Sequence, residues 1–434
     1  MTETQVEPDF DVIVVGAGIA GCVVAYQLAK QGHEVLVIER GEAPGSKNLS
    51  GGVLYSRVME QVFPGFLDQA PVERRITRNY IQFLNADSAV AIDYADQRLS
   101  EPVNAVTVLR AKLDAWLGEQ CEAEGAVLMP GVRVDSLLRE GGRVVGVKSG
   151  DDELRARVVV AADGVNSFIA RDAGLRPKPS QDQLAVGVKA VVRLSETQVA
   201  ERFHCAPGEG VAYAVVGDCT EGIGGGGFLY TNTDSISVGV VLRLDDLVAK
   251  NKAAAEVFDH FLAHPYVAPL LDGGELSEYG CHLVAEGGLA MLGDIVFDGL
   301  VIVGEAAGMT LNTGLTVRGM DLAAGSAIAA AAAIDSALKS GDTSQAGLDG
   351  YRTALFDSFV GKDLTTYAKA PHFLENPRMY VEYGELLANV LYAAFNHDLT
   401  PRKHLAKAAT DALRTSPVKL TTVVRDAFAG VRAL

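Results

Sequence analysis

Apolar residues gather in three uninterrupted runs, at residues 12–15, 158–162 and 300–303, and a turn of small residues follows each run. Continuous apolar strands of this kind are typical of the interior of a parallel sheet that is covered on both faces. Apolar positions at helical spacing follow the first run at residues 22–30 and the third at about residues 318–338. The pattern therefore predicts an α/β fold built on a parallel sheet.

A second pattern fills the middle of the chain, where apolar and polar residues alternate as they do in half-buried strands. The alternating segments are residues 76–92, 186–194, 210–216, 227–230 and 235–242. They predict an inserted antiparallel sheet, whereas residues 348–434 are helical in pattern. Further strands are expected at residues 126–129, 132–138 and 144–148, the last two joined by a hairpin at Gly141 and Gly142.

The first apolar run ends in the glycine turn Gly16-Ala17-Gly18-Ile19-Ala20-Gly21, and the second strand of the unit closes with Glu39. This order is typical of a dinucleotide-binding unit, which consists of a strand, a GxGxxG turn, a helix and an acid after the next strand. In such a unit the helix N-terminus faces the phosphates and the acid binds a ribose hydroxyl. The candidate residues of this unit are Gly16, Gly18, Ile19, Ala20, Gly21, Glu39 and Arg40.

A polar loop rich in glycine follows at residues 41–53 and contains Lys47, Asn48, Gly51 and Gly52. It is either an ordinary surface loop or a cofactor contact, and its position at the same sheet edge as the glycine turn favours the second interpretation. Arg110 opens the next helix, where it could pair with a phosphate or with a surface acid such as Glu119.

Two further turns have weaker signals. Asp163 and Gly164 end the second apolar strand, at the edge where ligands bind in open α/β sheets, although Asp-Gly is also common in plain turns. The glycine run at residues 222–227 also matches GxGxxG, but no apolar strand precedes it and no helix follows it. We interpret that run as a turn or a site of close backbone approach, which leaves no evident NAD(P)H domain.

Composition and charge narrow the possible partners. The formal charge is −17 and the pI is about 4.9, which argues against nucleic acid as a general partner. No signal for export precedes the first strand, and the longest apolar run, residues 323–333, is too short to span a bilayer. The five cysteines are scattered, so neither an iron–sulfur cluster nor a metal site is expected in this chain, and the pattern fits a reducing cytoplasm.

Residues 401–434 reverse the charge of the chain, with seven Lys or Arg against two Asp, which gives a local charge of +5. This basic segment is either a solvated helix face or a surface that binds an anionic membrane or an acidic protein.

With its three motifs at strand ends, the chain resembles the FAD-dependent fold of para-hydroxybenzoate hydroxylase and the geranylgeranyl reductases over about residues 11–338. The resemblance implies that the first motif holds the ADP half of FAD, that Asp163 and Gly164 touch the pyrophosphate region, and that Gly304 and Glu305 hold the ribityl chain and flavin. It also implies FAD contacts from Arg110 and from Val134. The family usually has Gly-Asp where this chain has Gly304-Glu305, which places the carboxylate one methylene further out.

A narrower resemblance covers nearly the whole chain. Residues 47–55, 314–323 and 376–378 are similar to electron-transfer-flavoprotein:quinone oxidoreductases, and among these to the FixC-type subunits, which lack the four-cysteine ferredoxin domain. The resemblance implies an FAD-containing subunit that accepts electrons from electron-transfer flavoprotein subunits, with a small ferredoxin-like iron–sulfur subunit, and reduces a quinone. It implies a cytoplasmic protein that is peripheral on the inner face of the cell membrane.

We therefore expect a Rossmann-like FAD-binding domain of the para-hydroxybenzoate hydroxylase type, with an inserted antiparallel β-sheet domain and a C-terminal helical region. The FAD-binding parts are residues 1–75, 101–183 and 286–345, the quinone or substrate parts are residues 76–100 and 184–285, and the helical region is residues 346–434.

The backbone of residues 313–317 is expected at a helix N-terminus beside the flavin, with Gly314, Leu315 and Thr316 as candidate contacts. No catalytic side chain is assigned, because the cofactor carries the redox chemistry. Two alternatives remain open, namely a self-contained reductase or hydroxylase that uses NAD(P)H, and a docking subunit with a structural FAD.

Overall fold

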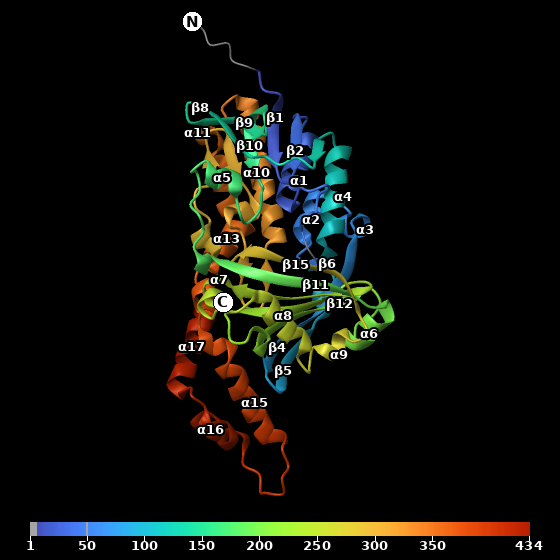
Figure 1. Cartoon of the computed structure of the whole chain (residues 1–434), viewed down its shortest axis with the longest axis vertical. Helices are drawn as coiled ribbons and strands as arrows, with labels where there is room; N and C mark the ends of the chain where they lie inside the picture. Colours follow the sequence, from blue (N-terminus) through green and yellow to red (C-terminus); the bar gives the residue numbers. More distant parts are fainter. Residues whose placement is uncertain (1–6, 49–50) are drawn as a thin grey trace.

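The computed structural model describes residues 7–48 and 51–434, and within them two large sheets meet at an angle (Figure 1). The first sheet has eight strands, and its central strands β10, β1, β2 and β7 are parallel, as is the pair β17 and β10. Its strands are β16 (Val296–Phe297), β17 (Leu300–Ile302), β10 (Asp152–Ala161), β1 (Phe10–Val15), β2 (Val35–Glu39), β7 (Val127–Pro130), β8 (Ser136–Glu140) and β9 (Arg143–Ser149). The three apolar runs of the sequence are thus adjacent strands at the centre of this sheet.

The second sheet has nine strands and is antiparallel except for the parallel pair β12 and β4. Its strands are β15 (Glu275–Ala285), β11 (Leu184–Arg193), β14 (Ser235–Arg243), β13 (Gly225–Thr231), β12 (Glu209–Gly217), β4 (Val72–Asn85), β6 (Val106–Leu109), β3 (Gly51–Leu54) and β5 (Ser88–Ala95). Two of these strands, β3 and β6, come from ranges that the sequence places in the FAD-binding part.

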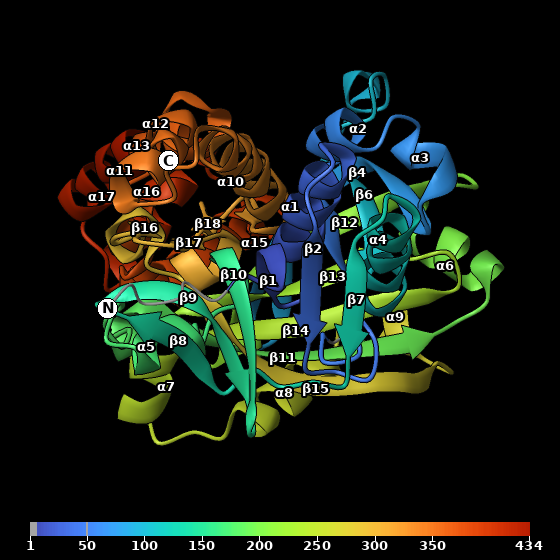
Figure 2. The ribbon, with the colours of Figure 1, turned by 90° about the horizontal axis from the view of Figure 1, so that it is seen from above.

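Helices cover both sheets, and the second sheet runs across the strand ends of the first (Figure 2). Helix α1 packs against α4 and α10 beside the first sheet, and α8 packs on the second sheet. The α-helices are α1 (Ile19–Lys30), α2 (Arg57–Val62), α3 (Phe66–Gln69), α4 (Arg110–Ala123), α5 (Phe168–Asp172), α6 (Glu196–Phe203), α7 (Leu244–Ala249), α8 (Ala254–Ala263), α9 (Ala268–Leu271), α10 (Met320–Ser340), α11 (Gln345–Leu348), α12 (Gly350–Asp357), α13 (Phe359–Thr366), α14 (Ala370–Leu374), α15 (Glu382–Phe395), α16 (Leu405–Thr415) and α17 (Leu420–Ala433). The 3-10 turns are η1 (Gln97–Leu99), η2 (Gln181–Gln183), η3 (Asp218–Thr220), η4 (Gly288–Met291), η5 (Gly304–Ala307) and η6 (Pro377–Tyr380).

The fold agrees with the class that the sequence predicts, an α/β domain with an inserted, mainly antiparallel sheet and a helical C-terminal region. It differs at two local points. Residues 131–135 form no strand, because the amides of Gly131 and Val132 bond to the carbonyls of Gly41 and Glu39 instead of to a sheet partner. Residues 313–317 are not a helix N-terminus: residues 313–316 form the turn of the hairpin β18 (Leu311–Asn312) and β19 (Val317–Arg318), and α10 begins only at Met320.

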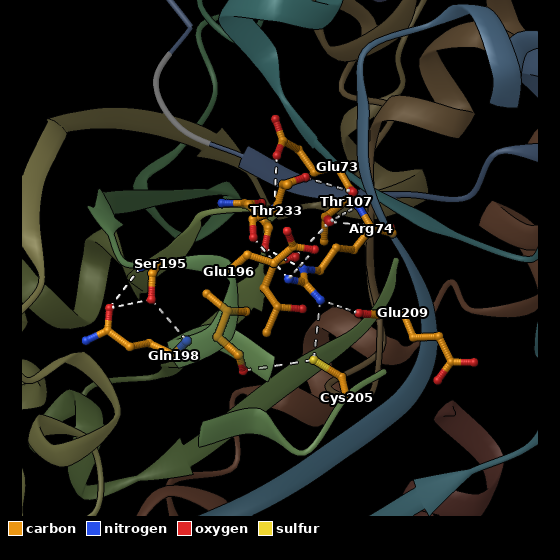
Figure 3. A network of polar contacts seen from close by, with 12 residues as sticks. Glu73, Arg74, Thr107, Ser195, Glu196, Gln198, Cys205, Glu209 and Thr233 are labelled. Carbon is orange, nitrogen blue, oxygen red and sulfur yellow. Dashed lines mark hydrogen bonds and ion pairs between the residues drawn. The ribbon is translucent and has the colours of Figure 1, made fainter. Parts of the chain in front are cut away.

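The second sheet is tied together at one end by Arg74 of β4, whose side chain is buried (Figure 3). Its guanidinium donates to the carbonyl oxygens of Asn232 (2.6 Å), Glu209 (2.9 Å) and Thr233 (3.0 Å). A buried cation of this kind is stable only because each of its N–H groups finds an acceptor. The network fixes the β13–β14 turn against the start of β12.

The C-terminal helices leave the body of the molecule. Helix α15 packs on β4 and β5, and α15, α16 and their connection project beyond the second sheet (Figure 1). Among the described residues, α10 alone is long and apolar enough to cross a membrane, and 78% of its apolar window is buried inside the protein. That burial is typical of a core helix of a folded domain.

Candidate functional site

One cavity of about 1320 Å³ lies where the two sheets meet. The segments that follow β1, β2, β10 and β17 line it on the first sheet, and β11, β12, β13 and β15 line it on the second. The carboxyl ends of the parallel strands therefore open into it, which is the usual position of a ligand in open α/β sheets.

The glycine turn after β1 has three glycines with different roles. Gly16 has a φ of +103° and lies so close to β10 that a Cβ there would be 2.4 Å from the Ala162 carbonyl oxygen. A Cβ on Gly21 would be 1.9 Å from the Gly16 oxygen, so this residue lets helix and strand pack. Gly18 has open space, since the nearest atom to its Cβ position is Nη2 of Arg110 at 3.7 Å. Space beside Gly18 is what a bound phosphate requires.

The N-terminus of α1 faces that space. Gly18 is the N-cap residue and has no side chain to bond the amides of the first turn. Unpaired amides and the positive end of the helix dipole favour an anion at this position.

Glu39 ends β2 beside the turn. Its Oε2 accepts a hydrogen bond from the Ala17 amide (2.9 Å), and its Oε1 accepts one from the Gly41 amide (2.7 Å). Both bonds hold the carboxylate at the cavity wall, where each oxygen retains a second lone pair for a ribose hydroxyl.

Arg110 begins α4 and is held by a buried acid, Asp114, rather than by Glu119. Its Nε and Nη2 donate to the two oxygens of Asp114, at 2.8 and 2.7 Å. The Asn48 amide also donates to Asp114, at 2.7 Å, so one fully buried carboxylate fixes both the arginine and the polar loop. The guanidinium is thereby preorganised next to Gly18 as an anion partner.

Asp163 follows β10 and has one satisfied and one unsatisfied oxygen. Oδ2 accepts a hydrogen bond from the Ile169 amide (3.1 Å), whereas Oδ1 is buried without a partner. Burial raises the pKa of this carboxyl to about 6. An orphaned polar atom in a cavity wall is explained by a ligand that supplies the missing hydrogen-bond donor.

The third strand end contributes Glu305 and the hairpin of residues 311–318. The Oε1 atom of Glu305 accepts a hydrogen bond from the Ala285 amide (3.3 Å), which links the two sheets. Gly314 has a φ of +76°, and its amide donates to Oδ1 of Asn312 (2.8 Å). The hairpin backbone thus lies exposed to the cavity without being part of a helix.

The structure brings nearly all candidate residues to this one cavity. Its lining includes Gly16, Gly18, Ile19, Ala20, Glu39, Arg40, Lys47, Asn48, Gly51, Gly52, Arg110, Val134, Asp163, Gly164, Glu305, Gly314, Leu315 and Thr316. Gly21 and Gly304 lie behind the wall, where each lets backbone segments pack; a Cβ on Gly304 would be 2.9 Å from that of Ala20. The roles of these residues toward a cofactor remain predictions.

Other polar groups near the cavity were not anticipated. Asp114 follows Arg110 by four residues, a spacing that is visible in the sequence. Lys189 of β11 lines the cavity, and nothing in its alternating strand indicates burial. Glu286 accepts a hydrogen bond from Asn312 (3.2 Å), and burial raises the pKa of Glu286 to about 7. No sequence signal identifies Glu286.

The glycine run at residues 222–227 behaves as interpreted from the sequence. It leads into strand β13 rather than into a helix, and a Cβ on Gly225 would be 1.9 Å from the Val241 oxygen. This is close backbone approach in a sheet and not a phosphate-binding turn.

The site as a whole fits a dinucleotide cofactor. It has open space at Gly18, a helix N-terminus, a preorganised arginine, an anchored acid and an orphaned carboxylate oxygen at the same cavity. Each of these features is satisfied by phosphate or hydroxyl groups.

Comparison with known proteins identifies that cofactor. Residues 9–217 match the FAD binding domain family, and residues 370–434 match the ETF-QO/FixC family C-terminal domain. The probable electron transfer flavoprotein-quinone oxidoreductase YdiS of Escherichia coli (strain K12) is 45% identical, over 98% of this chain and 99% of that protein. Protein FixC of Salmonella typhimurium is 42% identical, over 99% of this chain and 100% of that protein.

Solved structures share the fold at lower identity. A geranylgeranyl bacteriochlorophyll reductase-like protein from Thermoplasma acidophilum is 20% identical, with a TM-score of 0.72 over 96% of this chain and 98% of that one. The flavin-dependent brominase Bmp2 is 16% identical, with a TM-score of 0.63 over 96% of this chain and 98% of that one. The sequence relationships add the family to this fold, and the cofactor is FAD. The chain belongs to the ETF-QO/FixC family of FAD-dependent oxidoreductases.

Proposed function

We propose that this protein accepts electrons from an electron-transfer flavoprotein at its FAD and passes them to a membrane quinone. The observation that carries the proposal is the extent of the cavity. Beyond the cofactor cradle it continues over the second sheet to the C-terminal helices, where Phe373, Leu374, Met379 and Tyr380 line it. An apolar ring has room in this extension, and the helices that close it belong to the segment characteristic of the family.

FAD, when bound, supplies the electron transfer itself, by accepting electrons from one partner and releasing them to another. The residues of this chain bind and orient it. The α1 N-terminus and Arg110 would hold the pyrophosphate, Glu39 a ribose hydroxyl, and the hairpin of residues 311–318 would lie along the flavin. Glu286, which accepts a hydrogen bond from Asn312 of that hairpin, could hold a proton at neutral pH, because burial raises the pKa of Glu286 to about 7.

The names of the related proteins support the choice of partners. YdiS carries the name probable electron transfer flavoprotein-quinone oxidoreductase, and residues 370–434 match the ETF-QO/FixC family C-terminal domain. The cysteines of this chain are scattered along the sequence, so we assign any iron–sulfur step to a separate ferredoxin-like subunit.

The projecting C-terminal helices support attachment to a membrane surface. The exposed apolar side chains of α15, α16, α17 and their connections include Tyr392, Phe395, Leu399, Leu405, Leu420, Val424, Phe428 and Val431. Four of these side chains, Leu420, Val424, Phe428 and Val431, repeat at helical spacing along α17. Basic residues accompany them in residues 401–434. Helices with one apolar face and nearby Lys and Arg bind the interface of anionic membranes. We therefore place the protein in the cytoplasm, peripheral on the inner face of the cell membrane.

Anaerobic titration of the FAD-loaded protein tests the function. We expect its flavin absorbance to bleach with reduced electron-transfer flavoprotein and to return when a quinone is added. Rapid bleaching by NADH or NADPH alone would instead indicate a self-contained reductase. A flavin absorbance that never changes with any donor would indicate a docking subunit with a structural FAD.

Neutralising Arg402, Lys403 and Lys407 to Gln tests the membrane surface. Each basic residue near an anionic surface contributes about 1 kcal/mol, so we expect the triple variant to float with anionic liposomes far less than the parent. The matched control neutralises Lys30, Lys148 and Lys339, at the far end of the molecule, and should float normally. Equal flotation of all three proteins contradicts membrane binding through these helices.

A further inference from the structure

Lys189 places an amine in an unusual position on the second sheet. It lies in the middle of β11, where its register partners on both neighbouring strands are glycines, Gly239 of β14 and Gly280 of β15. Its side chain lines the cavity and passes over the next cavity-facing residue of its own strand, Gly187, whose Cβ position is 3.4 Å from the Lys189 Cε. The paired positions on both neighbouring strands therefore carry no side chain beside Lys189.

The ammonium group has no polar partner within residues 7–48 and 51–434. It makes no hydrogen bond and no ion pair with the described residues, and its Nζ lies over the ring of Phe228, 6.0 Å from the centroid. Burial and the nearby Arg110 charge lower the pKa of Lys189, and the Glu305 charge raises it. An enclosed amine without an acceptor is costly, and such groups are normally compensated by a ligand or a counter-charge.

The surface next to Lys189 is flat and aromatic. The rings of Phe228 and Tyr230, two residues apart on β13, stack with centroids 4.7 Å apart and planes 18° apart. The Phe228 ring covers Gly239, since a Cβ there would be 2.5 Å from the ring. The cavity wall thus offers an aromatic shelf with a cation over its Phe228 ring, an arrangement suited to a planar ring that carries an oxygen.

The known charges of the cofactor already have partners elsewhere. The N-terminus of α1 follows β1 of the first sheet, and Arg110 opens α4 and is paired with Asp114, whereas Lys189 lies on β11 of the second sheet. Because these groups already serve the pyrophosphate, we assign the amine to a second ligand in the same cavity.

We propose that the Lys189 ammonium binds a ring oxygen of a quinone-type electron acceptor that lies on the Phe228–Tyr230 shelf. The assignment rests on the proposed function, in which the acceptor is a quinone. A lysine ammonium donates hydrogen bonds and accepts none, so it binds a carbonyl oxygen and binds an ionised ring oxygen more tightly. Lys189 is therefore a ligand-binding residue that selects for oxygen-bearing, preferably anionic, rings.

Binding of two naphthoquinones to the oxidised, FAD-loaded protein tests this assignment. The probes are 2-hydroxy-1,4-naphthoquinone, an anion at neutral pH, and the neutral 2-methyl-1,4-naphthoquinone, each titrated by calorimetry. We expect the parent to prefer the anion and Lys189→Met to bind it about tenfold to a hundredfold more weakly, the range for a hydrogen bond to a charged group. Binding of the neutral ring should change much less.

Two further variants complete the experiment. Lys189→Arg keeps the charge and should retain the preference for the anion, and Lys178→Met makes the same change at an exposed lysine and should bind both rings as the parent does. Lys189→Met should fold with unchanged or higher thermal stability, because it removes an unpaired charge. The same ratio of affinities in the parent and in Lys189→Met overturns the proposal, and so does a parent that binds neither ring.

The FAD content of Lys189→Met tests the remaining alternative, in which the amine binds the cofactor. A large loss of FAD from this variant means that the amine pairs with the cofactor and also overturns the assignment. Because the titration uses no electron donor, it is independent of the proposed electron transfer. The titration could show a Lys189-dependent preference for the anion while the electron-transfer assay shows no quinone reduction. That pair of results would support the ring site and reject the quinone reductase function.

Discussion

The two sheets form opposite sides of one cavity, yet they present their polar groups in different states. Around the glycine turn several polar groups are held by protein partners, as Asp114 holds Arg110 and Asn48, and as two backbone amides hold Glu39, whereas Oδ1 of Asp163 has no partner. On the second sheet two polar groups that line the cavity, Nζ of Lys189 and the Tyr230 hydroxyl, have no hydrogen bond to any described residue, although Tyr80 and His282 of the same lining are hydrogen-bonded. The groups held by Asp114 and by the backbone amides are set before a ligand arrives, whereas the two unpaired groups on the second sheet are completed by a ligand.

This contrast corresponds to two kinds of ligand. A cofactor that stays bound is served by groups already fixed in the binding geometry, because preorganisation removes the cost of ordering them. A substrate that must enter and leave is better served by a wall with few, incompletely satisfied polar groups on an apolar surface. The comparison thus supports a resident FAD on the first sheet and a transient ring on the second.

Gly18→Val is expected to have the largest effect of the changes considered, a loss of FAD from the side of the first sheet. The backbone of Gly18 (φ −81°, ψ −175°) is extended and suits valine, and its Cβ position has no atom closer than 3.7 Å. The variant should therefore fold, but its side chain fills the space next to the α1 N-terminus. We expect FAD binding at least about tenfold weaker, equivalent to about 1.4 kcal/mol, measured as the flavin-to-protein absorbance ratio of the purified protein.

The matched control is Gly350→Val, at an exposed glycine whose Cβ position is 3.9 Å from its nearest neighbour. It should keep its FAD. A Gly18→Val protein that is as yellow as the parent shows that the pyrophosphate does not lie at this turn, and that the first sheet is not the cofactor side.

The cofactor side was the more predictable from the sequence, because its features are local. The three glycines, the helix that follows them and Glu39 lie within one strand–helix–strand unit, so their spacing already specifies their positions. Even the partner of Arg110 lies one helical turn away at Asp114. Here short-range geometry decides which groups meet.

The second-sheet side was less predictable, because distant segments create it. Lys189 occupies a polar position in an alternating strand, a pattern that equally fits an exposed face. It lines the cavity only because the loops after β1, β10 and β17 lie over this sheet. The turn at residues 313–316 likewise depends on side chains, since Oγ1 of Thr313 accepts a hydrogen bond from the Thr316 amide (3.2 Å). Because of this hairpin, α10 begins only at Met320.

Asp163→Asn tests the one incompletely paired carboxylate on the first-sheet side. Burial raises the pKa of Asp163 from its ordinary value of 3.8 to about 6 in the folded protein. The folded state therefore binds the proton more tightly, so the contribution of Asp163 to stability is greatest below pH 4 and decreases as the pH rises to about 6. Two pKa units correspond to at most about 3 kcal/mol.

We expect FAD-free Asp163→Asn to unfold at higher urea than the parent at pH 7.5 and at nearly the same urea at pH 4. The amide oxygen can still accept the Ile169 hydrogen bond and carries no charge. Asp151→Asn, at an exposed turn, serves as the control and should show no such pH-dependent difference. A stability difference that is independent of pH means that the Asp163 carboxyl is not a buried, ligand-dependent group.

Removing the Tyr230 hydroxyl is expected to have the smallest effect on the free energy of unfolding. Comparing this variant with a matched one behind the first sheet tests the difference between the two sides directly. In FAD-free protein, Tyr230→Phe breaks no hydrogen bond and should change the free energy of unfolding by less than about 0.5 kcal/mol. Tyr351→Phe is the matched change behind the first sheet, where the buried hydroxyl donates to the Ile302 carbonyl oxygen (3.1 Å), and it should cost about 1 kcal/mol. Equal losses in the two variants, measured by urea unfolding, would mean that Tyr230 is already paired without a ligand. The second sheet would then be as complete as the first, and the assignment of its shelf to a transient ring would lose its physical basis.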